Sequence, residues 1–180
     1  IPICFGLMAV SNNIVPWFFG EEYGEVSLLM KVLAPLVVFI GISNVTGIQY
    51  LVPVGRQRDY TLSVISGSVV NLILNSILIP MYQSLGASIA SICAEFTVMV
   101  VQLYIVRTKI SIPSILKLSS KYFVAGIIMF MSLSLIGKYL KPSITSTLLL
   151  VVIGFVIYTL TLLLERDRMV KEFLNIRKKD

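Results

Sequence analysis

The residues best able to do chemistry lie inside apolar stretches, where a single polar side chain interrupts the pattern. Glu95 lies in the middle of the run from Leu85 to Val106 and is the only ionisable residue at such depth in any apolar run. If this run crosses a membrane, a carboxylate at its centre costs about 2.5–3.5 kcal/mol. The carboxyl group must therefore be protonated, be paired with a polar partner, or face a water-filled cavity.

Asparagines on the preceding apolar run are candidate partners for this carboxyl group. Asn71 and Asn75 continue a small, polar stripe that begins with Ser63 and Gly67, and the four-residue spacing puts all four on one helix face. At a rise of about 1.5 Å per residue, Asn71 and Glu95 lie at similar depths below the connection between their runs. Their side chains could therefore hydrogen-bond.

Two interpretations of these polar residues are open. In the structural one, Asn71, Asn75 and Glu95 hold two membrane helices together through interhelical hydrogen bonds. In the functional one, Glu95 titrates or faces a hydrophilic cavity through which a polar substrate or a coupling ion passes. The sequence supports both interpretations.

A further apolar run, from Val32 to Val54, carries Asn44 and Gln49 and is interrupted by prolines and glycines. The interrupting residues are Pro35, Gly41, Gly47 and Pro53. Such breaks often indicate moving helices in transporters, although proline and glycine are also simply more frequent in membrane helices. We therefore add Asn44 and Gln49 to the candidate residues of a substrate or ion path.

Catalytic and metal-binding chemistry lacks its usual residues in this sequence. Histidine is absent, which removes the commonest metal ligand and the usual proton carrier near neutral pH. Cys4 and Cys93 both lie in apolar runs, and the aspartates Asp59, Asp167 and Asp180 lie on connecting or terminal segments. We therefore predict no catalytic residue, no metal site, no cofactor and a protein that is not an enzyme.

The elements that position these residues follow from the composition. Apolar residues make up 57% of the 180-residue chain and charged residues only 13%, with a mean hydropathy of +0.92, whereas soluble domains carry about 25% charged residues. Six stretches have the roughly 20 apolar residues that a membrane helix needs. They run from Ile1 to Phe19, Val32 to Val54, Thr61 to Pro80, Leu85 to Val106, Tyr122 to Leu140, and Ile144 to Leu164. We therefore predict an all-α integral membrane protein with six transmembrane helices.

The third and fourth runs are joined by a very short, uncharged connection at residues 81–84. This connection predicts a tight antiparallel hairpin. Gly86, Ala90 and Ala94 recur every fourth residue in the second arm of that hairpin, and small residues at this spacing let two helix backbones approach closely.

The positive charges predict the orientation, because lysine and arginine are retained on the cytoplasmic side. Twelve of the 15 lie on the second and fourth connections and on the C-terminal tail. We therefore expect these segments and the C-terminus to be cytoplasmic, and the charge needs no nucleic-acid partner. Two basic amphipathic segments, at residues 112–121 and 170–179, are expected to lie at anionic lipid headgroups.

Four segments follow one another in an order that resembles a known family. They are Phe19-Gly20-Glu21-Glu22-Tyr23, Gly55-Arg56-Gln57-Arg58, Asn71-Leu72-Ile73-Leu74-Asn75 with Ile79-Pro80, and Leu85-Gly86-Ala87-Ser88-Ile89-Ala90 with Ala94-Glu95. This order is similar to the C-terminal portion of bacterial polysaccharide and O-antigen repeat-unit flippases, the Wzx type within the multidrug/oligosaccharidyl-lipid/polysaccharide exporter superfamily. The resemblance covers about residues 1–110, and beyond them it rests on the number of spans.

The resemblance implies the last six helices of a fourteen-helix, two-lobe transporter in the bacterial cytoplasmic membrane. Residues 1–110 would be the last four helices of the C-terminal lobe, and residues 111–180 two additional helices and a basic cytoplasmic tail. The implied activity is the movement of an undecaprenyl-diphosphate-linked oligosaccharide to the outer leaflet, for capsule, O-antigen or exopolysaccharide synthesis. The implied partners are that lipid-linked oligosaccharide and the missing N-terminal lobe of the same protein.

Other functions remain as alternatives. The nearest alternative is a drug/cation antiporter or a lipid II flippase of the same superfamily. An antiporter is expected to have an ion site with several acidic residues, whereas Glu95 is a lone acid. A membrane enzyme lacks convergent catalytic groups. A purely structural anchor has no reason to carry a deep carboxylate or a broken helix.

Overall fold

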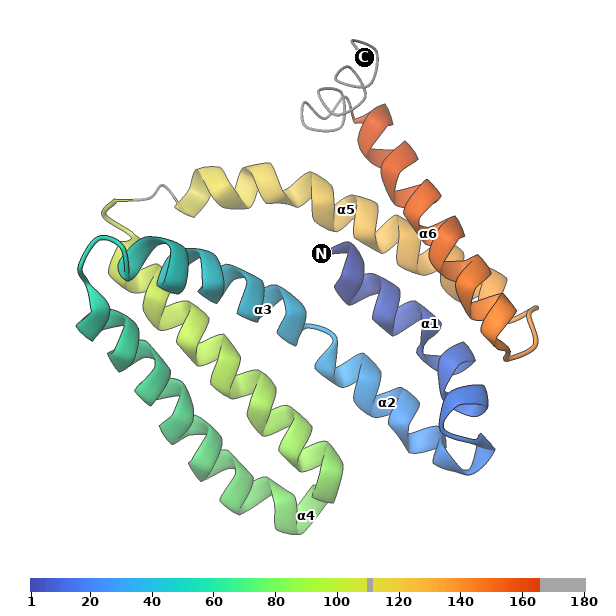
Figure 1. The fold of residues 1–180 in the computed structure, drawn as a ribbon, viewed down its shortest axis with the longest axis horizontal. Helices are drawn as coiled ribbons and strands as arrows, with labels where there is room; N and C mark the ends of the chain where they lie inside the picture. The colour runs from blue at the N-terminus through green and yellow to red at the C-terminus, as the bar shows by residue number, and fades with distance from the viewer. Residues whose placement is uncertain (110–111, 166–180) are drawn as a thin grey trace. The chain divides into compact units, whose positions relative to one another are not determined.

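The computed structural model of the protein describes residues 1–109 and 112–165, and of residues 112–118 it describes the backbone alone. These residues form helices and contain no strand. The elements are α1 (Pro2–Phe18), η1 (Glu21–Tyr23), α2 (Gly24–Leu33), α3 (Leu36–Ser43), η2 (Asn44–Leu51), α4 (Gln57–Val106), α5 (Ile112–Gly137) and α6 (Ile144–Leu164) (Figure 1). The predicted basic segment at 170–179 lies outside the described residues.

Four helical segments are long and apolar enough to cross a membrane by length and composition, in the part of the chain that the structure describes. They are Glu21–Leu51, Gln57–Val106, Ser119–Gly137 and Ile144–Leu164, while α1 is a shorter apolar helix of 17 residues. The sequence predicts six spans. The numbers differ because two of the predicted runs lie in the single element α4 and a third forms the shorter α1.

The predicted hairpin is confirmed within α4, which folds back on itself at Gln83 (Figure 1). We call residues 57–82 its first arm and residues 84–106 its second arm. Pairs of residues that face each other across the two arms run in opposite order. Gly86 approaches Leu78 near the turn, and Ser63 contacts Gln102 far from it. The arms are therefore antiparallel, as the short uncharged connection predicts.

The turn of this hairpin carries a backbone strain that glycine would relieve. Gln83 has φ 48° and ψ −122°, a conformation close to the first central position of a type II′ turn, where glycine is preferred. Holding a non-glycine residue there costs on the order of 1–3 kcal/mol. We expect Gln83→Gly to raise the thermal unfolding midpoint of the protein in detergent.

The matched control for this turn is Ser84→Gly, one residue further along. Ser84 lies in helical backbone, so glycine there should lower the midpoint through its poor helix propensity. Equal effects of the two substitutions would contradict a specific role of the backbone at Gln83.

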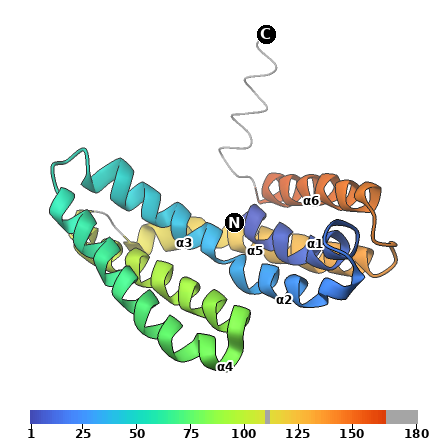
Figure 2. The same cartoon turned by 60° about the horizontal axis from the view of Figure 1, so that its bottom comes forward.

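The described residues divide into two compact units, of which the first contains residues 1–27 together with residues 116–165. Its core is formed by Ala9 and Val10 of α1, Met129 and Leu133 of α5, and Leu150 of α6. The indole Nε1 of Trp17 donates a hydrogen bond of 2.9 Å to Thr147 Oγ1, and α1 lies against α6 (Figure 2). The structure thus groups the first helix with two helices more than 90 residues away along the chain.

The second unit contains residues 28–115 and is built from α3, η2 and both arms of α4. Pro35 separates α2 from α3, because proline has no N–H to continue the helix. The π-helix η2 follows α3 directly, and Gly47 lies within it. The breaks that the sequence shows at Pro35 and Gly47 therefore coincide with a helix boundary and a change of helix type, whereas Gly41 lies inside regular helix α3.

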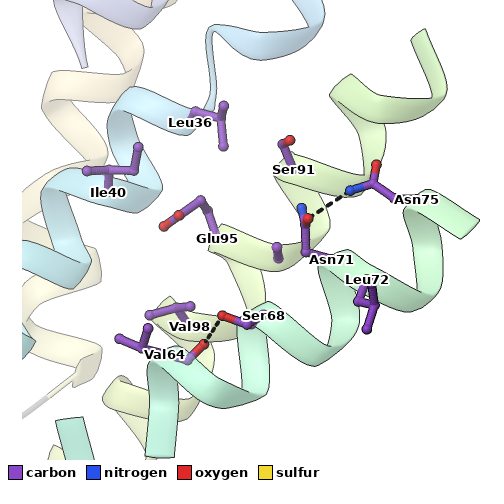
Figure 3. A pocket seen from close by; sticks show the side chains of 12 residues that line it. Leu36, Ile40, Val64, Ser68, Asn71, Leu72, Asn75, Ser91, Glu95 and Val98 are labelled. Carbon is purple, nitrogen blue, oxygen red and sulfur yellow. Dashed lines mark hydrogen bonds between the residues drawn. The ribbon is translucent and has the colours of Figure 1, made fainter. Parts of the chain in front are cut away.

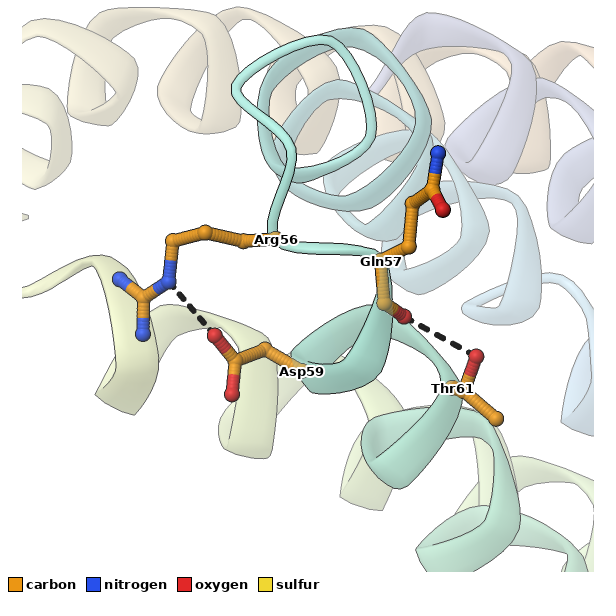
Figure 4. A network of polar contacts seen from close by, with 4 residues as sticks. All are labelled: Arg56, Gln57, Asp59 and Thr61. Carbon is orange, nitrogen blue, oxygen red and sulfur yellow. Dashed lines mark hydrogen bonds and ion pairs between the residues drawn. The ribbon is translucent and has the colours of Figure 1, made fainter.

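A short loop connects η2 to α4 and is held by local polar contacts (Figure 4). Gly55 has φ 79°, which suits glycine because the left-handed region is open to it. The Nε of Arg56 pairs with a carboxylate oxygen of Asp59 in the first turn of α4, and Thr61 Oγ1 donates to the Gln57 carbonyl at 3.0 Å. Asp59 there also complements the positive end of the helix dipole.

Candidate functional site

A cavity of about 590 Å³ lies in the second unit between α3 and the two arms of α4 (Figure 3). Its volume falls in the range of about 300–1,000 Å³ that is usual for small-molecule sites. The polar lining residues are Ser68, Asn71 and Asn75 of the first arm and Ser91 and Glu95 of the second. The apolar lining residues are Leu36 and Ile40 of α3 and Val64, Leu72 and Val98 of α4. Three predicted site residues thus line one cavity.

Glu95 is half-buried and extends from the second arm into the space that Leu36 and Ile40 border (Figure 3). Among the residues that the structure describes, no side chain forms a hydrogen bond or an ion pair with its carboxylate. The structure therefore shows this carboxyl group facing a cavity, without a polar side-chain partner in the described part of the chain.

The two asparagines bond to each other rather than to Glu95. Asn75 Nδ2 donates to Asn71 Oδ1 at 2.7 Å along the first arm. The other oxygen of the pair, Asn75 Oδ1, is buried and has no hydrogen-bond partner among the described residues. The structure therefore does not contain the hydrogen bond that Asn71 and Glu95 could form, and Asn71 pairs instead with Asn75, four residues along the same helix.

Small residues bring the two arms together. Ala90 and Ala94 are buried, as predicted for the small-residue series. A β-carbon at Gly67 would lie 2.9 Å from the carbonyl oxygen of Ala94, and one at Gly86 would overlap the carbonyl group of Leu78. The two arms therefore meet through glycine and alanine, and not through hydrogen bonds between the asparagines and Glu95 as the structural interpretation holds.

A buried polar triad lies beyond the cavity and was missed by the sequence analysis. The hydroxyl of Thr46 in η2 donates to Gln102 Oε1 at 2.6 Å, and Gln102 Nε2 donates to Ser63 Oγ at 3.0 Å. All three side chains are buried. The sequence does contain a feature that indicates this residue. Gln102 is an amide in an apolar run, seven residues after Glu95 and hence on nearly the same helix face.

The close approach of η2 to α4 explains why glycine occupies position 47. A β-carbon there would lie 2.7 Å from Gln102 Nε2 and 2.8 Å from the ring of Tyr60. The triad therefore depends on the absence of a side chain at Gly47.

Asn44 and Gln49 are both exposed on η2 and do not line the cavity. The structure thus separates them from Asn71, Asn75 and Glu95. No group of three or more histidine, cysteine, aspartate or glutamate residues that could hold a metal ion occurs within residues 1–109 and 112–165.

Comparisons with known proteins point to transport. A curated protein described as "Putative O-antigen transporter", from Escherichia coli strain K12, is 25% identical to this chain over 101 residues. The match covers 56% of the chain and 24% of that protein, so the chain spans about a quarter of the length of the curated relative it matches. No family model matches the chain, and no solved structure matches it. The chain thus combines apolar helices long enough to cross a membrane with similarity, over part of its length, to a protein described as an O-antigen transporter.

Proposed function

We propose that this chain is the C-terminal portion of a Wzx-type flippase in a bacterial cytoplasmic membrane. It would supply the last six of fourteen helices and work with an N-terminal lobe of the same protein. The substrate would be an undecaprenyl-diphosphate-linked oligosaccharide repeat unit, destined for capsule, O-antigen or exopolysaccharide. The C-terminus would be cytoplasmic, with its basic tail against anionic lipid.

The observation that carries this proposal is the polar cavity inside otherwise apolar helices. A membrane protein bears the cost of an unpaired carboxylate and of buried amides where they serve a polar substrate or ion. A sugar needs such a path because its hydroxyl groups cannot enter hydrocarbon without hydrogen-bond partners. Asn71, Asn75 and Glu95 offer those partners on one wall, while the lipid tail stays in the bilayer.

The proposed transport role of Glu95 is tested by comparing two substitutions in the complete gene product. We expect Glu95→Gln and Glu95→Ala each to lower transport about tenfold, equivalent to about 1.4 kcal/mol, at unchanged protein levels. The levels should hold because the carboxylate has no partner within the described residues, so its removal breaks no internal contact. Transport is measured as surface polysaccharide in a flippase-deleted strain, and protein level by immunoblot.

The control variant is Ser76→Ala on the same arm. Ser76 is exposed, lies outside the cavity lining and bonds only to the carbonyl of Leu72, so its loss should leave transport and protein level unchanged. Full transport by Glu95→Gln, with a lower protein level for Glu95→Ala, would contradict a role for the carboxylate in transport.

A second candidate function is a drug/cation antiporter or a lipid II flippase of the same superfamily. An unpaired carboxylate facing a cavity is the observation that favours the antiporter, because it can take up a cation or a proton. Export of a cationic dye by the complete protein, lost in Glu95→Gln, without any rescue of surface polysaccharide would support this candidate over the oligosaccharide flippase.

A further inference from the structure

We infer that the cavity between α3 and α4 selects sugar units that donate hydrogen bonds, such as neutral or acetamido sugars, and disfavours acidic sugars such as uronates. This inference rests on the proposed function, because it names the class of repeat unit that the flippase would carry. It concerns the sugar portion of the substrate alone.

The first argument is the charge of the lining. Among the described residues around the cavity, Glu95 is the one charged side chain, and neither lysine nor arginine is present. Two like charges at an effective dielectric constant of about 20 and a separation of about 6 Å repel strongly enough to weaken binding by roughly a hundredfold. A uronate placed in this cavity would meet the carboxylate of Glu95, and none of the described lining residues supplies a cation to offset it.

The second argument is the balance of hydrogen-bond donors and acceptors. Asn75 Oδ1 is a buried acceptor with no partner in the described part of the chain, and an ionised Glu95 only accepts. The hydroxyls of Ser68 and Ser91 already donate to backbone carbonyls of their own helices, at 3.0 Å each, so they too have only acceptor capacity left. The donors that remain on the two amides are both N–H bonds of Asn71 Nδ2 and the second N–H of Asn75 Nδ2, whose first already donates to Asn71 Oδ1.

This excess of acceptors suits a ligand that is rich in donors. Sugar hydroxyls and the N–H of an acetamido group can donate to the carboxylate of Glu95, which faces the cavity. A carboxylate or phosphate on the ligand brings only acceptors and would offer no donor to the Glu95 carboxylate. Leu36, Ile40 and Val98 add an apolar surface against which the C–H face of a sugar ring can pack.

The test measures protection of a cysteine in the cavity. Cys4 and Cys93 are replaced by alanine in the complete protein, Ser68 is replaced by cysteine, and the rate of reaction with a water-soluble maleimide is followed in nanodiscs. The probes are methyl 2-acetamido-2-deoxyglucopyranoside, methyl glucopyranoside and methyl glucopyranosiduronate at millimolar concentrations. A cysteine at Ser76, which is exposed outside the cavity lining, reports any general effect of the probes.

We expect the acetamido and neutral glycosides to slow the reaction at position 68 but not at position 76. The uronate should need roughly a hundredfold higher concentration, as expected from like-charge repulsion, and Glu95→Gln should remove this difference. Equal protection by the uronate and the neutral glycoside in the protein with Glu95 would overturn the inference, as would no protection by any of the three. Neither result touches the flippase proposal, which the surface polysaccharide assay decides independently.

Discussion

Gly86→Ala should strongly reduce the amount of folded protein, because its new β-carbon would overlap the carbonyl group of Leu78 at the narrow end of the α4 hairpin. The obstacle is backbone, so no side-chain rotation can relieve it, and the two arms must move apart. Overpacking of this kind typically lowers the free energy of unfolding by about 1–3 kcal/mol and occasionally more. We expect a loss of about 3 kcal/mol. The measurements are the thermal unfolding midpoint and the monodisperse yield in detergent.

The same substitution at Gly41 is the matched control. Gly41 lies inside α3, and a β-carbon there would meet nothing within 4 Å. Alanine should therefore leave the stability unchanged or raise it by up to about 1 kcal/mol through helix propensity. An unchanged midpoint for Gly86→Ala would contradict the close approach of the two arms.

Gln102→Ala should give the second largest loss of stability, also about 3 kcal/mol. The side chain is 1% exposed, so its truncation leaves a cavity, and such losses run to about 2–5 kcal/mol for residues of similar size. It also removes the acceptor of Thr46 and the donor to Ser63. The measurement is the free energy of unfolding in detergent or lipid.

Gln102→Met separates the two contributions, because methionine keeps the length of the side chain and loses only its hydrogen bonds. Hydrogen bonds between membrane helices are worth about 0.6 kcal/mol on average, and both hydroxyls keep backbone acceptors, with Ser63 bonded to Tyr60 and Thr46 close to Ile42. We therefore expect a loss of about 1 kcal/mol. Equal losses for alanine and methionine would mean that the triad contributes hydrogen bonds and no packing.

The sequence predicts the all-helical class and the α4 hairpin well, since both follow from properties of neighbouring residues. An uncharged connection at residues 81–84 permits a tight turn, and the small residues Gly86, Ala90 and Ala94 then face the other arm. The proline and glycine breaks likewise predict irregular backbone, and Pro35 does separate two helices. The π-helical form of η2 does not follow from them, because it depends on packing against α4.

Contacts between distant segments could not be predicted in the same way. Hydrophobic periodicity shows which face of a helix is apolar but not which helix will cover it. The hydrogen bond from Trp17 to Thr147 joins residues 130 positions apart, and the sequence offers no sign of this pairing. Whether residues 1–110 form part of one transporter lobe stays a prediction.

The candidate site was predicted in part. Asn71, Asn75 and Glu95 were identified because they are polar at depth, and they do line one cavity. Their bonding was not predicted, since depth along two helices does not determine where side chains point. Gln102 is not among the predicted site residues, because its partners Thr46 and Ser63 lie on segments whose packing against it cannot be read from periodicity.

The close backbone contacts within α4 determine which wall of the cavity can move. At Gly67 and Gly86 the backbones of the two arms are in close contact, so the hairpin is expected to move as one rigid body. The opposite wall, α3, is only eight residues long and lies between the break at Pro35 and the π-helix η2. A change in the width of the cavity would therefore require α3 to move relative to the hairpin, and Pro35 is the break that leaves it free to do so, because the buried triad ties η2 to both arms.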